Sequence, residues 1–485
     1  MTETATSAGQ PSGAVPASEG LTHRLVSWAA GLRYDDVPLH ARDRAKDLLI
    51  DAVACALAAD DAEEMAQIGA LAAHLGYGGT STVIGGRGGR PAAVATLLNG
   101  YRITALTSCD VYAPARFHVT PEVVPPALAI AERDRRSGRA LLVALVAGFE
   151  LATRIAAAMD YASLRPRGWH TPGVVGPLGG ATAAGLLLGL DERGLRHALG
   201  IAASQSSGTW ASWGTPTVKF HQARAALAAL MGATLASTGF AASDTVLEHP
   251  DGGLLTTYAG GGRPERATDG LGEAWEFEQI SLRPWPGATP VQPVITGLFT
   301  LLRQGSLPTT APGAIRISVN PVVHEQHARF VHPQGTFEAM LSIHYAAAAI
   351  ALWGRLGFAE YQPRAYTDER LATVIDRVIE VTPDPKLGPL QCRVVVETAD
   401  GTRVQDIAAP LGNPDNPAPR AVLAAKFTAC ATGSLGDRAE QVLDMLGTLE
   451  AVPDVALLCD LLRPRGAVGQ GQVIGTGTLA KGERR

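Results

Sequence analysis

Ionisable side chains stand directly before apolar helices at three places in the sequence. His118 lies in RFHVTP, before a helix predicted to begin near Pro121, and His170 lies in RGWHTPG, before a helix rich in small residues. Lys219 and His221 open a third helix, in GTPTVKFHQARAALAAL. The N-terminus of a helix carries partial positive charge and unpaired N–H donors, so each of these places favours a bound anion.

The residue types suit acid–base chemistry on a carboxylate. Histidine and tyrosine are general acids and bases, and Tyr345 stands inside the apolar stretch LSIHYAAAAI. Lys219, Arg116 and Arg283 would supply positive charge for carboxylate groups. The pattern predicts proton transfer next to a carboxylate, carried out by side chains without a cofactor.

Each of these residues also has an ordinary structural explanation. A histidine at the start of a helix, such as His118 or His170, is more often a cap or a surface residue than a catalyst. Lys219 could be a solvated first-turn lysine, and Tyr345 a core residue whose hydroxyl has a partner. Spacing by itself therefore leaves the functional reading open.

Other chemistries lack their motifs. The densest histidine cluster, His324, His327 and His332 in HEQHARFVH, offers one pair at helical spacing but no third ligand at a metal-binding spacing, so no metal site is predicted. The glycine-rich stretches GGRGGR and YAGGGR contain neither a GxGxxG nor a GxxxxGK[ST] frame after a strand. SQSSG lacks the G-x-S-x-G pattern of a nucleophile elbow.

Composition favours a large folded protein. The chain has 485 residues, of which 46% are hydrophobic and 18% charged, and the length predicts two or more domains. A net charge of −5 argues against a nucleic-acid partner, which would need a basic face. The five cysteines are odd in number and form no CxxC pair, so we expect a reducing, cytoplasmic compartment. No signal peptide or membrane span is expected.

Hydrophobic periodicity divides the chain into a helical part and a part that also contains strands. Helical patterns run from residue 21 to residue 240, whereas AIRISVN, VIEVTPD and QCRVVVETADGTRVQDI read as strands, the last as a hairpin around Asp-Gly. We predict a mainly α protein with an inserted α+β lid. The predicted segments are a disordered leader at 1–20, an all-helical domain at 21–276 and 411–464, the lid at 277–410 and a flexible tail at 465–485.

Several stretches, in this order along the chain, resemble the MmgE/PrpD family, which includes 2-methylcitrate dehydratase and cis-aconitate decarboxylase. They are LLIDAVACALA, NGYRITALTSCD, HVTPEVVPPALAIAE, RGWHTPGVVGPLGGATAAGLLLGL, ALGIAASQSSG, VKFHQARAALAALMGATLASTGF, RPWPG, EAMLSIHYAAA and NPDNP. The resemblance implies a helical domain with a lid, an active site between them, no cofactor or metal, and a homodimer.

The resemblance also implies roles for individual residues. His118, His170, Lys219 and Tyr345 match catalytic positions, and His221 belongs to the substrate-binding set. The other substrate-binding residues implied or predicted are Asp110, Tyr112, Arg116, Trp169, Arg283 and Gln292.

The chain departs from the family pattern at two motifs. An acidic run of the family is reduced here to Asp110, in TALTSCDVY. In the lid motif, RPWPGATPVQ, Ala288 replaces a cysteine and Gln292 replaces a histidine. A glutamine amide does not titrate near neutral pH. We therefore expect a pocket that has lost a titratable group and that takes a less charged substrate.

The sequence thus predicts a lyase of the dehydratase or decarboxylase type, acting by proton transfer on a small carboxylate or other acidic, enolisable metabolite that is not the usual tricarboxylate. Two alternatives stay open. One is an isomerase, epimerase or cyclase of specialised metabolism, and the other is a catalytically silent homologue that only binds.

Overall fold

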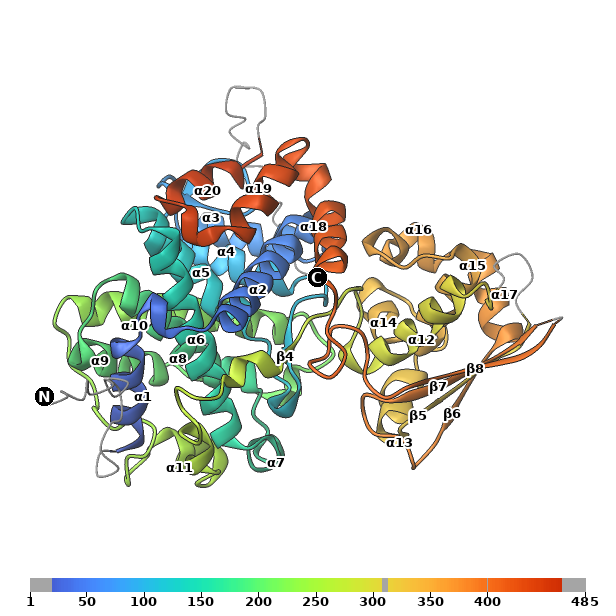
Figure 1. The fold of residues 1–485 in the computed structure, drawn as a ribbon, viewed down its shortest axis with the longest axis horizontal. Helices are drawn as coiled ribbons and strands as arrows, with labels where there is room; N and C mark the ends of the chain where they lie inside the picture. The colour runs from blue at the N-terminus through green and yellow to red at the C-terminus, as the bar shows by residue number, and fades with distance from the viewer. Residues whose placement is uncertain (1–19, 308–312, 399, 465–485) are drawn as a thin grey trace, which may run out of the picture.

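A computed structural model describes residues 20–307, 313–398 and 400–464. The predicted tail, and all of the predicted leader except Gly20, lie outside the described residues. The chain forms a large helical body and a smaller lid that holds a mixed sheet, as Figure 1 shows. The expected architecture, mainly helical with an inserted lid, is confirmed.

Helix α8 (Thr171–Leu187) lies at the centre of the body. It packs against α5 (Thr120–Arg133), α6 (Gly138–Met159) and α10 (Thr217–Ser237). Small residues allow this close packing. A Cβ added at Gly148 of α6 would lie 2.8 Å from the Gly179 carbonyl oxygen of α8. The two backbones therefore approach more closely than any larger residue at Gly148 would allow.

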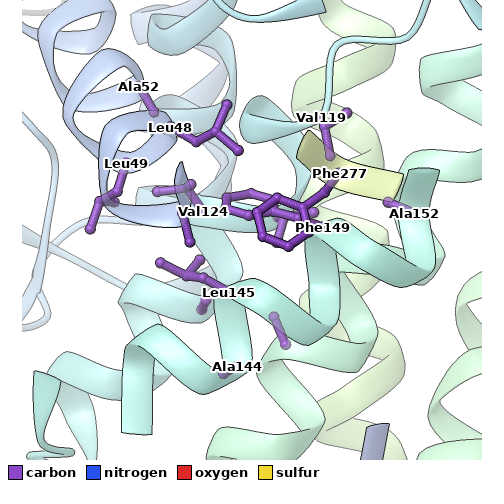
Figure 2. Close-up of a cluster of buried hydrophobic side chains, with 14 of the residues drawn as sticks. Leu48, Leu49, Ala52, Val119, Val124, Ala144, Leu145, Phe149, Ala152 and Phe277 are labelled. Atoms are coloured by element: carbon purple, nitrogen blue, oxygen red, sulfur yellow. The ribbon is translucent and has the colours of Figure 1, made fainter. Parts of the chain in front are cut away.

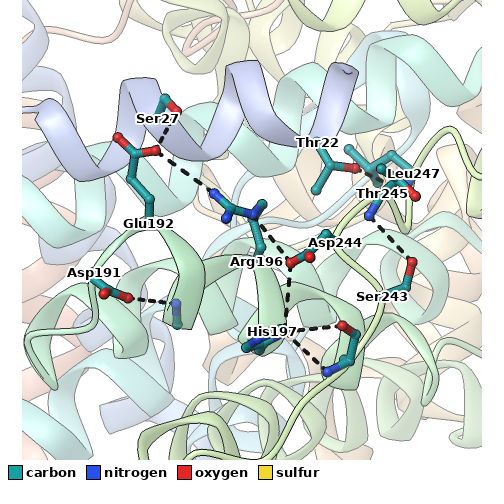
Figure 3. Close-up of polar contacts among 12 residues, drawn as sticks. Thr22, Ser27, Asp191, Glu192, Arg196, His197, Ser243, Asp244, Thr245 and Leu247 are labelled. Atoms are coloured by element: carbon teal, nitrogen blue, oxygen red, sulfur yellow. Dashed lines mark hydrogen bonds and ion pairs between the residues drawn. The ribbon is translucent and has the colours of Figure 1, made fainter. Parts of the chain in front are cut away.

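The remaining helices of the N-terminal part surround this centre. They are α1 (Leu21–Gly31), α2 (Leu39–Ala58), α3 (Met65–Leu75), α4 (Ala92–Thr104), α7 (Tyr161–Leu164), α9 (Glu192–Ala203) and α11 (Leu254–Ala259). Figure 3 shows polar contacts where α1 meets α9: the Ser27 hydroxyl donates to Glu192 at 2.8 Å, and Arg196 lies 3.4 Å from Asp244. The Ser27 contact joins α1 to α9, and the Arg196 contact joins α9 to the segment that contains Asp244.

Aromatic and aliphatic side chains fill the core between α2, α5 and α6 (Figure 2). Phe149 of α6 lies beside Phe277, with ring centroids 6.2 Å apart. Helix α6 is long and apolar enough to cross a membrane by length and composition. However, 83% of its most apolar 18-residue stretch is buried inside the protein. In this structure α6 is a core helix.

The lid contains a four-stranded sheet in the order β6-β5-β7-β8. Strands β5 (Ile315–Val319) and β6 (Ile379–Pro383) are parallel, and β7 (Cys392–Thr398) and β8 (Gly401–Ile407) form the predicted hairpin. Helix α12 packs on β7 and β8, and α15 packs on β6. The lid helices are α12 (Gln292–Arg303), α13 (Pro321–Val323), α14 (Thr336–Leu341), α15 (Ile343–Trp353), α16 (Pro363–Tyr366) and α17 (Glu369–Val378), with a π-helix at His324–Ala328.

Short strands that the sequence pattern did not predict also occur. Strands β1 (Ser81–Thr82) and β2 (Gly89–Arg90) pair with each other. Strands β3 (Val111–Tyr112) and β4 (Ile280–Ser281) pair across 167 residues of intervening sequence, from 113 to 279. Two-residue strands show no alternation, so periodicity cannot find them. The β3–β4 pair fixes the start of the lid against the loop that leads to His118.

After the lid, the chain returns to the body as α18 (Arg420–Leu435), α19 (Arg438–Gly447) and α20 (Val455–Leu461), drawn in red in Figure 1. Helix α18 packs on α2. A second apolar cluster spans the body and the lid, because it joins Ala95 and Leu98 of α4 to Val294 and Ile295 of α12.

A buried lysine ties these segments together. Lys426 of α18 is 8% exposed, and its ammonium lies 2.7 Å from the Asp51 carboxylate of α2. It also donates to the carbonyl oxygens of Ser108 and Arg283, each at 2.8 Å. An ammonium has three N–H donors, and all three find an acceptor here. One side chain therefore joins α2, α18, the Ser108 loop and the start of the lid.

We predict that Lys426→Met lowers the free energy of unfolding by about 3–5 kcal/mol, because it leaves the Asp51 carboxylate buried without its partner. Thermal unfolding followed by calorimetry measures the effect. Lys386→Met, at an exposed lysine, is the matched control. The double variant Lys426→Met/Asp51→Leu should recover much of the loss, and a single variant as stable as the parent would contradict the prediction.

Candidate active site

A cavity of about 850 Å³ lies between the body and the lid. Both parts contribute to its wall. Its polar lining residues are Thr104, Thr107, Arg116, His118, His170, Lys219, Gln222, Arg283, Thr289, Asn320, Gln326, His327 and Gln391. Among the described residues that line it there is no aspartate or glutamate, so the wall itself contributes only positive or neutral side chains.

Helix starts supply the body side of the cavity. His118 lies two residues before α5, His170 directly precedes α8, and Lys219 is the third residue of α10. These three helices pack against one another, which brings their N-terminal ends to one place. The sequence reasoning therefore identified residues that the tertiary structure does bring together.

His118 is held by a backbone carbonyl. Its Nδ1 lies 2.7 Å from the carbonyl oxygen of Asp110, which can only accept, so Nδ1 carries the proton and Nε2 keeps its lone pair. Burial, together with the positive charge of Arg283, lowers the pKa of His118 to about 3. The imidazole is therefore neutral at physiological pH, with Nε2 unprotonated.

His170 is paired with a second histidine. Its Nδ1 lies 3.1 Å from Nδ1 of His221, so one ring donates and the other accepts. Burial lowers the pKa of His170 well below its ordinary value, and the nearby His221 and His118 lower it further. The lowered pKa values make both His170 and His118 neutral at physiological pH.

Lys219 is buried beside one acid. Its ammonium donates to the carbonyl oxygen of Ala105 at 2.6 Å and lies 3.5 Å from the Glu64 carboxylate. Burial lowers the pKa of Lys219, although Glu64 acts in the opposite direction. The lysine still has N–H capacity for a ligand, because an ammonium has three donors.

Two arginines line the cavity in different ways. Arg283 is 2% exposed and donates to the carbonyl oxygens of Cys109 and Gly287 at 2.6 and 3.0 Å. No carboxylate of the described residues lies within ion-pair distance of its guanidinium. Arg116 is exposed and lies over the ring of Tyr161 at 5.2 Å. Arg283 is thus a buried positive charge with no acidic partner among the residues that the structure describes, and Arg116 adds charge at the rim.

Three predicted site residues lie outside the cavity wall. The Tyr345 hydroxyl donates to the carbonyl oxygen of Glu360, and the Tyr112 hydroxyl donates to Glu276. The Asp110 carboxylate accepts from the backbone of Val119 at 2.8 Å and so caps the start of α5. None of the three is among the described lining residues. The structure gives Tyr345 and Tyr112 core positions and makes Asp110 a support for His118.

Three further predicted residues also lie outside the lining set. The Gln292 amide donates to the carbonyl oxygens of Trp285 and Gly287, at 3.1 and 3.2 Å. Trp169 packs edge-on against Tyr258, with ring centroids 4.8 Å apart. His221 lies behind the cavity wall, where its Nδ1 contacts Nδ1 of His170. The expected loss of a titratable group at Gln292 therefore does not change the cavity wall directly.

The sequence reasoning missed several lining residues. His327 lines the cavity and donates from Nδ1 to the Leu341 carbonyl oxygen at 2.8 Å, and burial lowers its pKa. It lies on the π-helix, a form that is frequent at functional sites. Trp210, Trp213 and Phe337 supply the aromatic surface. The repeated tryptophans in GTWASWGT were the available signal for two of them.

The histidines of HEQHARFVH diverge in the structure. His324 contacts the Val381 carbonyl oxygen at 3.2 Å, whereas His332 lies 2.9 Å from Asp376 and His327 faces the cavity. Within residues 20–307, 313–398 and 400–464, no group of three or more His, Cys, Asp or Glu side chains could hold a metal ion. His324, His327 and His332 therefore serve separate contacts.

The fold defines a mainly helical protein of two domains, with a small mixed sheet in the second. The sequence matches the MmgE/PrpD N-terminal domain over residues 23–267 and the MmgE/PrpD C-terminal domain over residues 285–450. The chain therefore belongs to the MmgE/PrpD family.

Similar proteins include cis-aconitate decarboxylases. The chain is 29% identical over 467 residues to a cis-aconitate decarboxylase-like protein, oryM, of Aspergillus oryzae, covering 91% of this chain and 97% of the relative. It is 28% identical over 476 residues to the cis-aconitate decarboxylase of Aspergillus terreus, with 92% and 96% coverage. The human cis-aconitate decarboxylase is 27% identical over 391 residues, with 77% and 80% coverage. These relatives suggest a lyase.

The lowered pKa values predict an unusual pH profile for kcat/KM, which reports groups of the free enzyme. His118 stays neutral down to about pH 3, so we expect no inflection near 6.5 from it. Lys219 binds an anion only when protonated, and burial lowers its pKa from 10.5, so kcat/KM should fall on the alkaline side before pH 10.5. Lys219→Arg should move this limb to higher pH, because arginine stays charged. A limb that does not move would contradict the assignment.

Proposed function

We propose that this protein is a lyase, of the decarboxylase or dehydratase type, whose own side chains move protons on a small carboxylate. One observation carries the proposal: neutral histidines and buried cations line a single body–lid cavity without an acidic side chain among the described lining residues. Arg283 and Lys219 would bind the acid. Positive groups fixed in a water-poor site also stabilise negative charge that develops during reaction.

The proton steps follow from the tautomers. Nε2 of His118 has the lone pair needed to accept a proton from the carbon next to the carboxylate. Binding an anion beside His118 raises its pKa from about 3, since a nearby negative charge favours the protonated form. His170 is the second candidate, and its contact with His221 offers a route to exchange the proton. In decarboxylation, the electron pair left when CO₂ departs takes up a proton at carbon. A protonated His118 or His170 would deliver that proton and be protonated again from solvent before the next turnover.

Charge balance supports a substrate with fewer carboxylates than the usual tricarboxylate. Lys219 is partly neutralised by Glu64, which leaves Arg283 as a buried cation without a carboxylate partner among the described residues. An unpaired buried carboxylate is costly, so extra carboxylates would weaken binding by several kcal/mol. Gln292 and Asp110 lie outside the cavity wall, so neither side chain sets the charge of the lining.

We predict only trace turnover of cis-aconitate and 2-methylcitrate by the purified protein. The unsaturated product is followed by absorbance, and CO₂ release is measured for cis-aconitate. A kcat/KM near about 10⁴ M⁻¹s⁻¹ or above for either acid would contradict the charge argument while leaving the lyase reaction in place.

A panel of enolisable mono- and dicarboxylates in D₂O, followed by NMR, tests the reaction class. Deuterium incorporation with loss of CO₂ or water supports the lyase. Incorporation without such loss supports the isomerase alternative, and binding without exchange supports a silent homologue. For the best acid, His118→Gln and Lys219→Ala should lower kcat/KM by about two orders of magnitude or more. Tyr345→Phe, outside the cavity, is the matched control and should retain activity.

We also propose a homodimer in a reducing, cytoplasmic compartment. All five cysteines are buried and unpaired, as a reducing compartment would leave them. Sedimentation of the purified protein at micromolar concentration should give about twice the 50.4 kDa of the chain. A stable monomer would contradict the dimer.

A further inference from the structure

A stack of aromatic rings and guanidinium groups crosses from the body to the lid. The indoles of Trp210 and Trp213 lie nearly parallel, with an interplanar angle of 10° and centroids 6.2 Å apart. Arg165 of the body lies over the Trp210 ring at 4.2 Å, and Arg329 of the lid lies over the Trp213 ring at 5.9 Å. Each indole thus has a guanidinium within cation–π range, with the closer contact at Trp210.

Backbone hydrogen bonds fix the loop that carries the indoles to the segment that carries His170. The Ser207 N–H donates to Gly173 at 3.0 Å, the His170 N–H donates to Gly208 at 3.0 Å, and the Trp210 N–H donates to Gly168 at 2.7 Å. Because the two segments are joined in this way, the aromatic pair and the candidate catalytic histidine share one support. The Trp210 ring lies 5.9 Å from the His170 ring.

Both indoles line the cavity, and apolar side chains of the lid add to the same lining. Phe337, Leu341 and Leu390 are among them. Phe337 also lies near the candidate anion site, with the Lys219 ammonium 5.2 Å from its ring centroid. The cavity thus combines a small charged region with an extended apolar surface.

A compact acid leaves this surface unused. A cavity of about 850 Å³ falls within the range of pockets that enclose drug-sized ligands, about 300–1,000 Å³. Such pockets bind mainly through apolar walls, with a few polar groups that fix orientation. Lys219 and Arg283 could hold the carboxylate, but they do not account for the tryptophan pair.

We propose that the substrate carries an apolar alkyl or aryl substituent that lies against Trp210 and Trp213 while its carboxylate binds Lys219 and Arg283. This inference rests on the proposed function and specifies its substrate class: an acid with a hydrocarbon group, in place of a compact polycarboxylate. The indole pair then determines specificity, because it stabilises the bound substituent by apolar contact without contacting the reacting carboxylate.

Binding of malonate, benzylmalonate and hexylmalonate to the full chain, measured by titration calorimetry, tests the proposal. The three probes share two carboxylates and differ only in the apolar group. Benzylmalonate and hexylmalonate should bind about 30-fold more tightly than malonate or better, the scale expected for burying one such group. Trp213→Ala should remove about tenfold of this gain, measured as the ratio of substituted-malonate to malonate affinity within the variant itself.

Further variants separate the possible failures. Trp213→Phe should keep most of the gain, which shows that an aromatic surface suffices, and Trp28→Phe, a tryptophan that packs on Trp275 within the body, is the matched control. Lys219→Met should weaken all three acids alike. Equal affinity for the three malonates, or a gain that Trp213→Ala does not reduce, overturns the aromatic subsite and leaves the proposed lyase standing. No binding of any malonate overturns the anion site and the proposed function with it.

Discussion

The buried ammonium of Lys426 is the contact on which the body–lid arrangement depends. Ser108 and Lys426 are 318 residues apart in the sequence, yet the lysine donates to the Ser108 carbonyl oxygen, to the Arg283 carbonyl oxygen and to the Asp51 carboxylate. The Ser108 loop leads to Asp110, whose carbonyl oxygen sets the tautomer of His118. The Arg283 segment brings the buried guanidinium into the cavity. A lysine of the returning helix therefore holds both sides of the candidate site in register.

Burial gives the cavity its chemical character. His118 and His170 lose the stabilisation that water gives to their protonated forms; Arg283 lowers the pKa of His118 further, and His221 and His118 lower that of His170. Arg283 and Lys219, which line the same cavity, would attract a carboxylate. An arriving anion then reverses part of the effect on the histidines, so binding and readiness for proton transfer are coupled.

The aromatic pair adds a second requirement to this electrostatic one. The loop with Trp210 and Trp213 is bonded to the segment of His170, and Arg329 of the lid meets it from the other side. A ligand between body and lid would therefore touch charged, aromatic and catalytic groups that share the same supports. The position of the substituent would therefore affect how the carboxylate is aligned.

Much of the fold could be predicted from the sequence, because its elements are local. Apolar periodicity located the main helices, and the Asp-Gly turn located the β7–β8 hairpin. The order of motifs indicated the family, which the comparisons confirm. The placement of His118, His170 and Lys219 at helix starts was also visible in the sequence, since charged residues before small-residue helices interrupt an otherwise apolar pattern.

Only the tertiary structure decided which of the buried polar groups face the cavity. Periodicity shows that a residue such as Tyr345 points inward, but it does not distinguish a core from a pocket, because both are screened from water. Contacts with neighbouring segments make that distinction: the Glu360 carbonyl oxygen accepts from the Tyr345 hydroxyl, Asp110 caps α5, and His327 on the π-helix lines the cavity. The sequence by itself determined which residues could do chemistry, and packing across hundreds of residues determined which of them meet.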